Sequence, residues 1–230
     1  MGGSSSRRDF LHTAAAAAAA TGLAAGILRA EEDFDDCRAV CQAAPRAALG
    51  RDEIVRIGII GTGGMGLAHI DAFLKIGADN AAKVRIEALS DVCDSRWYAA
   101  KEKIDTAQGG NVAVYRDYRE LLKVPALHGV LIATPEHWHG RMAEDAIIAG
   151  KDVYLEKPMT LNLRDALRLQ KVAHANRDVI VVVGTQYVMT PSYQAARDLI
   201  GKGAIGKPVW SQTSYCRNSS WSFSLESGGG

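Results

Sequence analysis

The chain has 230 residues, of which 47% are hydrophobic and 23% are charged, and its formal net charge is +1. These values are ordinary for a globular protein of one or two domains. Because the charge is near zero and the sequence has no basic stripe, zinc-finger spacing or RNA-binding aromatic motif, we expect no nucleic-acid partner and no attraction to an anionic membrane.

The first thirty residues differ in composition from the rest. Residues 6–11, SRRDFL, have the S-R-R-x-F-L form of a twin-arginine export signal, and an alanine-rich apolar segment follows at residues 14–28. That segment is too short and too rich in alanine to predict a membrane span. We therefore predict a twin-arginine signal peptide over residues 1–30, the twin-arginine translocase as a partner during export, and a periplasmic or exported location. A disordered or helical alanine tail is the alternative.

Residues 31–53 are rich in acids and alanines and contain a proline and a glycine, which indicates a linker. Cys37 and Cys41 lie in this segment, four residues apart, an awkward spacing for a disulfide within one helix. They can oxidise in an exported tail, pair with another chain or remain reduced. We interpret Cys93 and Cys216 as ordinary small apolar residues, because the four cysteines show no metal-ligand spacing.

Residues 55–60 form a short apolar run rich in β-branched side chains, which predicts a strand buried on both faces. The run ends in residues 61–66, GTGGMG, a G-x-G-x-x-G motif, and apolar residues at helical spacing predict a helix over residues 64–76. In a dinucleotide site the three glycines permit a tight turn, leave room for the pyrophosphate and let the helix pack closely on the strand. A glycine turn without a ligand is the alternative.

A second strand is predicted at residues 84–90, and Asp91 follows it directly. A carboxylate at this point of a dinucleotide site accepts hydrogen bonds from the ribose diol. The spacing from Gly61 to Asp91 is longer than the roughly 20 residues usual for this motif. We expect the loop at residues 77–82 to absorb the excess.

The remaining elements continue to alternate along the chain. We predict further strands at residues 112–115, 130–133, 152–155 and 179–183, and helices at 94–104, 118–122, 141–149 and 163–176. Asp94 and Asp117 are the expected N-caps, and Gly150 is the expected helix stop. The helix predicted at 163–176 has an apolar side made of Leu163, Ala166, Leu167, Leu169 and Val172. This alternation predicts an α/β fold, a doubly wound parallel sheet covered on both faces, over residues 54–183.

In such sheets ligands bind beyond the carboxyl ends of the strands. Polar residues interrupt the pattern at these ends: Asp91, residues 134–139, residues 156–158 and Gln186. Lys157 follows a buried strand and precedes a proline, so its ammonium group can orient a substrate hydroxyl or carbonyl. A partly desolvated lysine there can also transfer a proton. A surface lysine at a strand end is the alternative.

Residues 137–139 form an H-W-H sequence. Two imidazoles and Glu136 would make a metal site, but no distant third ligand is apparent, so we predict no metal. We favour a lip over the nicotinamide, in which Trp138 packs and a histidine lies near the substrate; a purely structural tryptophan corner stays open. We interpret His69, His128 and His174 as ordinary structural histidines.

With these motifs in place the chain resembles the Gfo/Idh/MocA family, which includes glucose–fructose oxidoreductase and inositol dehydrogenase. The resemblance covers residues 54–215 and rests on VRIGIIGTGGMG, ALSDVCD, IATPEHWHG, YLEKPMT and VGTQ. It implies hydride transfer between NAD(P) and a hydroxyl-bearing carbon of a sugar, polyol or related carbohydrate. Asp91 favours NAD because a carboxylate repels a 2′-phosphate, whereas Arg96 keeps NADP open.

The resemblance also implies roles for individual residues. The pyrophosphate is assigned to Gly61, Gly63, Met65 and Gly66, the adenosine ribose to Asp91, and the nicotinamide half to Thr134, Pro135 and His137. Glu156 and Lys157 would reach the nicotinamide ribose and the reacting centre, with Lys157 as the catalytic residue. Lys157 and Gln186 would bind the substrate.

Residues 184–230 are predicted to begin a C-terminal α+β open-sheet domain, with a helix at 192–202, a turn at 203–208 and one strand at 209–215. The family's second domain carries a catalytic aspartate–histidine pair, and no histidine follows His174 here. We therefore expect a C-terminally truncated sequence that is inactive alone, and a full-length protein that can form homo-oligomers.

The favoured function is an NAD(P)-dependent sugar or polyol oxidoreductase. Twin-arginine export carries folded proteins and nicotinamide cofactors are cytoplasmic, so we hypothesise that the cofactor is held tightly through catalysis. One alternative is a glycosidase that uses bound NAD in a cycle of oxidation, elimination and re-reduction. Another is a non-catalytic nucleotide- or sugar-binding module. The sequence leaves the substrate open.

Overall fold

The computed structural model describes residues 42–43, 49–50, 53–79 and 83–214. The predicted signal peptide, most of the predicted linker, and Cys37, Cys41 and Cys216 lie outside these residues. The chain divides into two compact units, Met1–Thr185 and Gln186–Gly230. Within the described ranges, no helix combines the length and apolar character needed to cross a membrane.

The first unit contains a six-stranded sheet in which every neighbouring pair is parallel. Its strands are β1 (Val55–Ile60), β2 (Val84–Ser90), β3 (Ala113–Tyr115), β4 (Gly129–Ile132), β5 (Asp152–Glu156) and β6 (Val181–Gly184). The strand order is β3-β2-β1-β4-β5-β6, so the winding direction reverses between β1 and β4. This topology confirms the predicted doubly wound α/β fold.

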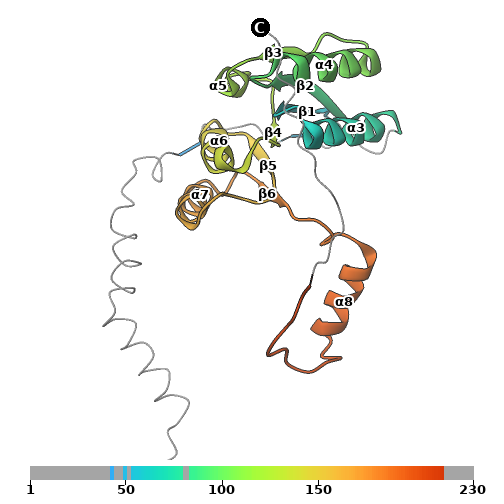
Figure 1. Cartoon of the computed structure of the whole chain (residues 1–230), viewed down its shortest axis with the longest axis vertical. Helices are drawn as coiled ribbons and strands as arrows, with labels where there is room; N and C mark the ends of the chain where they lie inside the picture. Colours follow the sequence, from blue (N-terminus) through green and yellow to red (C-terminus); the bar gives the residue numbers. More distant parts are fainter. Residues whose placement is uncertain (1–41, 44–48, 51–52, 80–82, 215–230) are drawn as a thin grey trace, which may run out of the picture. The chain divides into compact units, whose positions relative to one another are not determined.

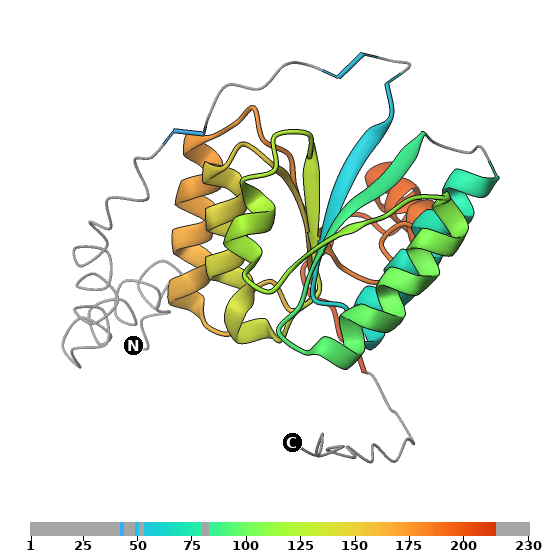
Figure 2. The same ribbon diagram turned by 90° about the horizontal axis from the view of Figure 1, so that it is seen from above.

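Helices cover both faces of the sheet. Figures 1 and 2 show α3 (Gly64–Ala78) and α4 (Asp94–Gln108) on one face, and α5 (Tyr118–Leu122), α6 (Glu136–Ile148) and α7 (Leu163–Ala175) on the other. Successive residues of a strand point to opposite faces. Ile59 accordingly packs in the α3–α4 core and Ile60 in the α5–α7 core. Burial on both faces explains why the last four residues of β1, residues 57–60, carry no polar side chain.

One helix start and one N-cap differ from the predictions. Helix α6 begins at Glu136 rather than Arg141, with Pro135 at the N-cap at φ −57°. Proline's fixed φ suits a helix start, so the polar residues 136–139 form the first turn instead of a loop. In α4 the N-cap is Cys93, not Asp94. Asp94 is the first helical residue, and its carboxylate accepts from Trp97 Nε1 at 3.0 Å and from Arg116 at 3.1 Å.

Two other helix signals are confirmed. The Asp117 side chain accepts the backbone N–H of Arg119 and so caps α5. Gly150 has φ +71° directly after the C-cap of α6, the left-handed conformation in which helices commonly end.

The predicted apolar side of α7 is partly wrong. Leu169 and Val172 are buried, but Leu163 and Leu167 are exposed by 73% and 38%. Polar contacts hold this end of the helix instead. The Asn162 side chain caps it at Asp165 N, and Arg168 Nε lies 2.6 Å from the buried Glu144 carboxylate of α6.

In the second unit, α8 spans Pro191–Gly201. The strand predicted at residues 209–215 does not form over 209–214, and Tyr215 lies outside the described residues. A strand needs a hydrogen-bonding partner, and these residues pair with none in the described part of the chain. Val209 and Trp210 are correspondingly exposed by 90% and 77%.

Candidate functional site

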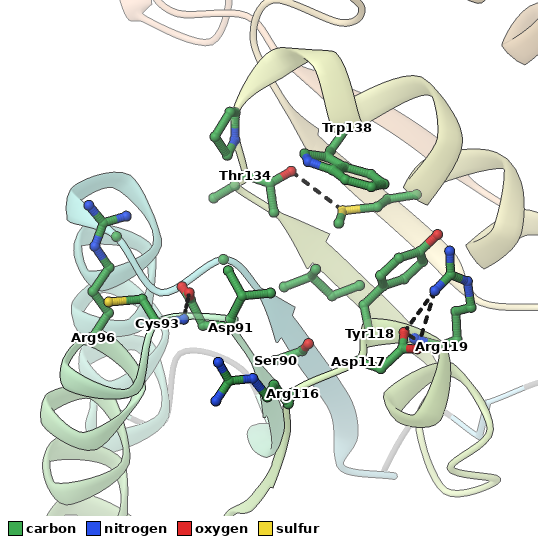
Figure 3. Close-up of a pocket in the computed structure, with 17 residues that line it drawn as sticks. Ser90, Asp91, Cys93, Arg96, Arg116, Asp117, Tyr118, Arg119, Thr134 and Trp138 are labelled. Atoms are coloured by element: carbon green, nitrogen blue, oxygen red, sulfur yellow. Dashed lines mark hydrogen bonds and ion pairs between the residues drawn. The ribbon is translucent and has the colours of Figure 1, made fainter. Parts of the chain in front are cut away.

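A cavity of about 630 Å³ opens beyond the carboxyl ends of β1, β2 and β4 (Figure 3). It lies at the reversal of strand order, where open α/β sheets bind their ligands. Its lining comes from the loop after β1, from residues 90–93 and Arg96 after β2, from residues 116–119 around the start of α5, and from residues 133–135, Trp138 and Met142 after β4. Figure 3 shows these groups arranged around a common space.

The glycine loop forms one wall of the cavity. Gly61 has φ +91°, and a Cβ there would lie 2.7 Å from the carbonyl oxygen of Ala133. A Cβ on Gly66 would overlap the Gly61 carbonyl oxygen, so α3 starts against β1 only because the side chain is absent. A Cβ on Gly63 would meet only Arg96 at 3.4 Å. These three features leave the backbone N–H groups at the start of α3 accessible to a pyrophosphate.

Asp91 is fixed at the cavity by hydrogen bonds to backbone and side chain. Its Oδ2 accepts from Thr62 N at 2.7 Å and from Thr62 Oγ1 at 3.0 Å, and its Oδ1 accepts from Cys93 N at 2.9 Å. An ionised carboxylate has about four acceptor positions, so capacity remains for a ribose hydroxyl. Sequence reasoning missed Thr62, which is fully buried. Thr62 occupies the x position of G-x-G, at which the motif specifies no residue type.

Two arginines line the cavity near Asp91. Arg96 is in the first turn of α4, and Arg116 forms an exposed ion pair with Asp94. Close by, the hydrogen bond with the Ser95 hydroxyl, followed by one from the Arg96 backbone N–H, lowers the pKa of the Cys93 thiol. The cavity thus has a carboxylate for a diol and guanidinium groups for phosphates.

The other rim of the cavity follows β4. Thr134, Pro135 and Trp138 line it, and the Thr134 hydroxyl donates to Met142 Sδ at 3.5 Å. His137 is exposed, with its ring centroid 6.0 Å from that of Trp138, and does not line the cavity. Below them Tyr118 donates to Asp145 at 2.7 Å. Burial, with the Asp145 hydrogen bond, raises the pKa of Tyr118 to about 12.

His139 is buried and does not face a ligand. Its Nδ1 lies 2.7 Å from the carbonyl oxygen of Pro158, and its Nε2 lies 2.7 Å from that of Thr134. Both nitrogens are therefore engaged, and neither is left to coordinate a metal. Among the described residues, no group of three histidine, cysteine, aspartate or glutamate side chains is placed to hold a metal ion.

The end of β5 carries Glu156 and Lys157. Glu156 is buried, and its Oε1 lies 2.7 Å from His69 Nε2 of α3, while its Oε2 accepts the Lys157 backbone N–H at 3.0 Å. The His69 ring also meets Tyr154 edge-on at 5.4 Å. Lys157 is exposed and precedes a cis Pro158. Sequence reasoning interpreted His69 as an ordinary structural residue and gave it no link to Glu156, because the two are 87 positions apart.

The structure thus separates the predicted site residues into groups. Gly61, Gly63, Asp91, Thr134 and Pro135 line one cavity. Gly66 serves the packing beside it, and Met65, His137, Glu156 and Lys157 lie outside its lining. Gln186 is the first residue of the second unit. Its substrate role, like the other assigned roles, stays a prediction.

Comparison with known proteins gives consistent relatives. A family profile described as the Gfo/Idh/MocA oxidoreductase family, NAD-binding Rossmann fold, matches residues 55–185. Inositol 2-dehydrogenase 1 of Saccharopolyspora erythraea is 31% identical over 157 residues, covering 67% of this chain and 44% of that protein. Glycosyl hydrolase family 109 protein 2 of Shewanella sp. is 25% identical over 234 residues, covering 94% of this chain and 47% of that protein.

Solved structures agree with these matches. The crystal structure of myo-inositol dehydrogenase from Lactobacillus casei in complex with NAD(H) and myo-inositol superposes with a TM-score of 0.61 at 25% identity. The match covers 68% of this chain and 44% of that one. The chain spans about half the length of the curated relatives it matches.

Proposed function

The chain belongs to the Gfo/Idh/MocA oxidoreductase family, and we propose that it forms the NAD-binding part of a dehydrogenase that acts on a sugar, polyol or related carbohydrate. The family match and the NAD(H)-bound neighbour confirm the dinucleotide cofactor predicted from the glycine loop. The observation that carries the proposal is that the glycine loop, Asp91 and Lys157 all follow strands that end at one edge of the sheet.

The cavity residues fit the cofactor. The N–H groups at the start of α3 would bind its phosphates, and the fixed Asp91 carboxylate would accept from its adenosine ribose. We propose NAD rather than NADP, because the Asp91 carboxylate repels a 2′-phosphate; in NADP such a phosphate would have Arg96, which also lines the cavity, as its partner. Bound NAD supplies the acceptor or donor of a hydride. Protein side chains would bind and orient the substrate.

Lys157 is proposed to handle the reacting oxygen. Its ammonium is exposed at the end of β5, and within the described part of the chain it forms no ion pair. Three N–H donors let the ammonium orient a substrate hydroxyl or carbonyl and stabilise negative charge that develops on its oxygen. Gln186, Glu156 and His137 are proposed as further groups near the substrate and the nicotinamide half.

Two measurements test this function. NAD should bind the protein with one equivalent per chain, and Lys157→Met should weaken NAD binding far less than it lowers turnover, because Lys157 lies outside the cavity lining. Because this chain alone is expected to be inactive, turnover is measured in the whole protein: oxidation of a panel of inositols and sugars, followed as NADH formation, should fall by about 10²- to 10⁴-fold in Lys157→Met. Unchanged turnover by Lys157→Met would contradict the catalytic role.

A second candidate function is an NAD-dependent glycosidase. The observation that favours it is the length of the match to a glycosyl hydrolase family 109 protein, 94% of this chain against 67% for the inositol dehydrogenase. Product analysis separates the two: a glycosidase releases the aglycone without net NADH, whereas a dehydrogenase forms an oxidised carbohydrate with equivalent NADH. Stoichiometric NAD binding with neither product would indicate a non-catalytic binding module.

We further propose that the protein is exported by the twin-arginine translocase and holds its cofactor tightly. The support is the SRRDFL sequence before the alanine-rich segment. Replacing Arg7 and Arg8 by lysine should retain the protein in the cytoplasm, and purified periplasmic protein should carry nucleotide absorbance at 260 nm. A rapidly reversible, weak NAD affinity would contradict the tight-binding proposal. Homo-oligomers are proposed for the whole protein and are tested by light scattering.

A further inference from the structure

We propose that His69 and His139 are positioning residues that fix the main chain on both sides of Lys157. The inference rests on the proposed function of Lys157. Lys157 is flanked by Glu156 and Pro158, and each of these neighbours is bound by one histidine. The two histidines come from α3 and α6, which cover opposite faces of the sheet (Figure 2). The loop that carries Lys157 is therefore held from both layers.

The first anchor uses both oxygens of one buried carboxylate. His69 Nε2 lies 2.7 Å from Glu156 Oε1, and the Lys157 N–H donates to Glu156 Oε2 at 3.0 Å. Glu156 is 6% exposed, so its carboxylate is largely removed from water. One carboxylate thus joins α3 to the backbone N–H of Lys157 itself. Displacing His69 would free the carboxylate that holds that N–H.

The second anchor uses both nitrogens of one buried imidazole. His139 is 1% exposed, and its two nitrogens face the carbonyl oxygens of Pro158 and Thr134, each at 2.7 Å. Each ring nitrogen is therefore within hydrogen-bonding distance of the main chain of a different segment. Thr134 lines the cavity and Pro158 follows Lys157. His139 therefore ties the rim of the cofactor cavity to the loop of the proposed catalytic lysine.

The residue after His139 strengthens this arrangement. A Cβ on Gly140 would lie 3.2 Å from Asp165 Cβ and 3.4 Å from Thr160 Cγ2. The absence of a side chain lets Thr160, which follows Pro158, and Asp165 of α7 pack closely against α6. The main chain around Lys157 is thus fixed at close range while its ammonium stays exposed. That combination suits a group that must meet a reacting atom at a set distance.

Hydrogen exchange of the Lys157 backbone amide tests the proposal. The 230-residue protein is labelled with ¹⁵N-lysine, and the Lys157 signal is assigned by its loss in Lys157→Arg. We expect exchange of this amide to rise about tenfold in His69→Gln and in His139→Leu. His139→Gln keeps one side-chain donor and should rise less than His139→Leu. The matched control is His174→Gln, the same substitution at an exposed position of α7, which should change nothing.

The outcomes separate a positioning role from a general structural one. The helical amides of Lys75 and Lys103 report on the rest of the fold, and they should keep their exchange rates. The proposal is overturned if Lys157 exchange is unchanged in both histidine variants, or if Lys75 and Lys103 accelerate equally. Should His139→Leu fail to fold, His69→Gln and His139→Gln decide the question. Absence of NAD binding by the unaltered protein would contradict the proposed function without affecting this readout.

Discussion

The two halves of the sheet edge build their parts of the site in opposite ways. At the ends of β1 and β2 the decisive feature is missing side chains: Gly61, Gly63 and Gly66 leave backbone exposed to a cavity. At the ends of β4 and β5 the decisive feature is buried side chains, because His139 and Glu156 bind backbone groups of neighbouring segments. The first half leaves space for a ligand, and the second half fixes the position of the main chain around Lys157.

The helices behind each half show the same contrast. Helix α3 buries only Gly66 and Ile70, whereas α6 buries seven residues, including the polar His139 and Glu144. A helix so deeply packed is a stable base for groups that must not move. The comparison teaches that binding a cofactor and holding a reacting group place different demands on two halves of one sheet.

The largest expected effect on NAD binding comes from filling the space made by the first half. Gly66→Ala places a Cβ on the Gly61 carbonyl oxygen, so α3 must shift away from β1. Overpacking of this kind costs about 1–3 kcal/mol in stability, and displacement of the phosphate-binding turn should weaken NAD binding by about 100-fold, equivalent to about 2.7 kcal/mol. Titration calorimetry and thermal unfolding measure the two effects.

Gly64→Ala is the matched control, because a Cβ on Gly64 meets nothing within 4 Å. Its helical position should even favour alanine by up to about 1 kcal/mol. If both variants bind NAD equally, the close approach of α3 to β1 is unimportant and the comparison fails.

The next prediction concerns whether buried polar contacts stabilise the helices behind the second half. Arg168 of α7 lies 2.6 Å from Glu144 of α6, a residue with no exposed side-chain surface. Arg168→Met deprives a buried carboxylate of a charged partner and should lower the free energy of unfolding by about 3 kcal/mol. Lys123→Met, which breaks the exposed pair with Glu120, should cost below about 0.5 kcal/mol. Urea denaturation of the two variants makes the comparison, and equal losses would contradict it.

A smaller effect is expected at Asp91, where the first half does use a side chain. Asp91→Asn keeps the shape of the side chain but replaces one carboxylate oxygen with an NH2 group. That donor then faces either the Thr62 N–H or the Cys93 N–H, which are themselves donors. We expect a loss of about 1–2 kcal/mol in stability and about tenfold weaker NAD binding. Asp79→Asn, at an exposed carboxylate outside the cavity lining, is the control and should leave the affinity unchanged. An equal loss of affinity in Asp79→Asn would contradict the assignment of the ribose to Asp91.

The contrast also explains what could be predicted from the sequence. Strands buried on both faces and the glycine motif depend on neighbouring residues, so β1, β2 and the roles of the glycines could be deduced locally. The anchors of the second half could not. His69 meets Glu156 across 87 positions, and His139 meets a carbonyl 19 positions away. No periodicity or spacing rule encodes such contacts.

The remaining errors have local causes. The predicted start of α6, residue 141, lies five residues after the observed start at Glu136. The first turn, residues 136–139, shows no apolar periodicity from which a helix could be predicted. The apolar side predicted for α7 assumed burial along its whole length, but Arg168 and Asn162 hold its first turns. Residues 209–214 have strand-like composition, and composition alone supplies no partner strand.

The smallest expected effect concerns Tyr118, which lies where the two halves meet, lining the cavity and donating to Asp145 of α6. Burial and Asp145 raise its pKa to about 12, against 10 for a free phenol. A pKa raised in the folded state favours the neutral form, so the stabilisation is fully present below pH 10 and is lost as the pH rises from 10 toward 12. Between pH 9 and pH 11 the protein should lose about 1 kcal/mol by this route. Tyr118→Phe loses the Asp145 hydrogen bond at every pH and should show a correspondingly flatter decline. Parallel slopes for the two proteins in urea denaturation would mean that folding does not raise the pKa of the Tyr118 phenol.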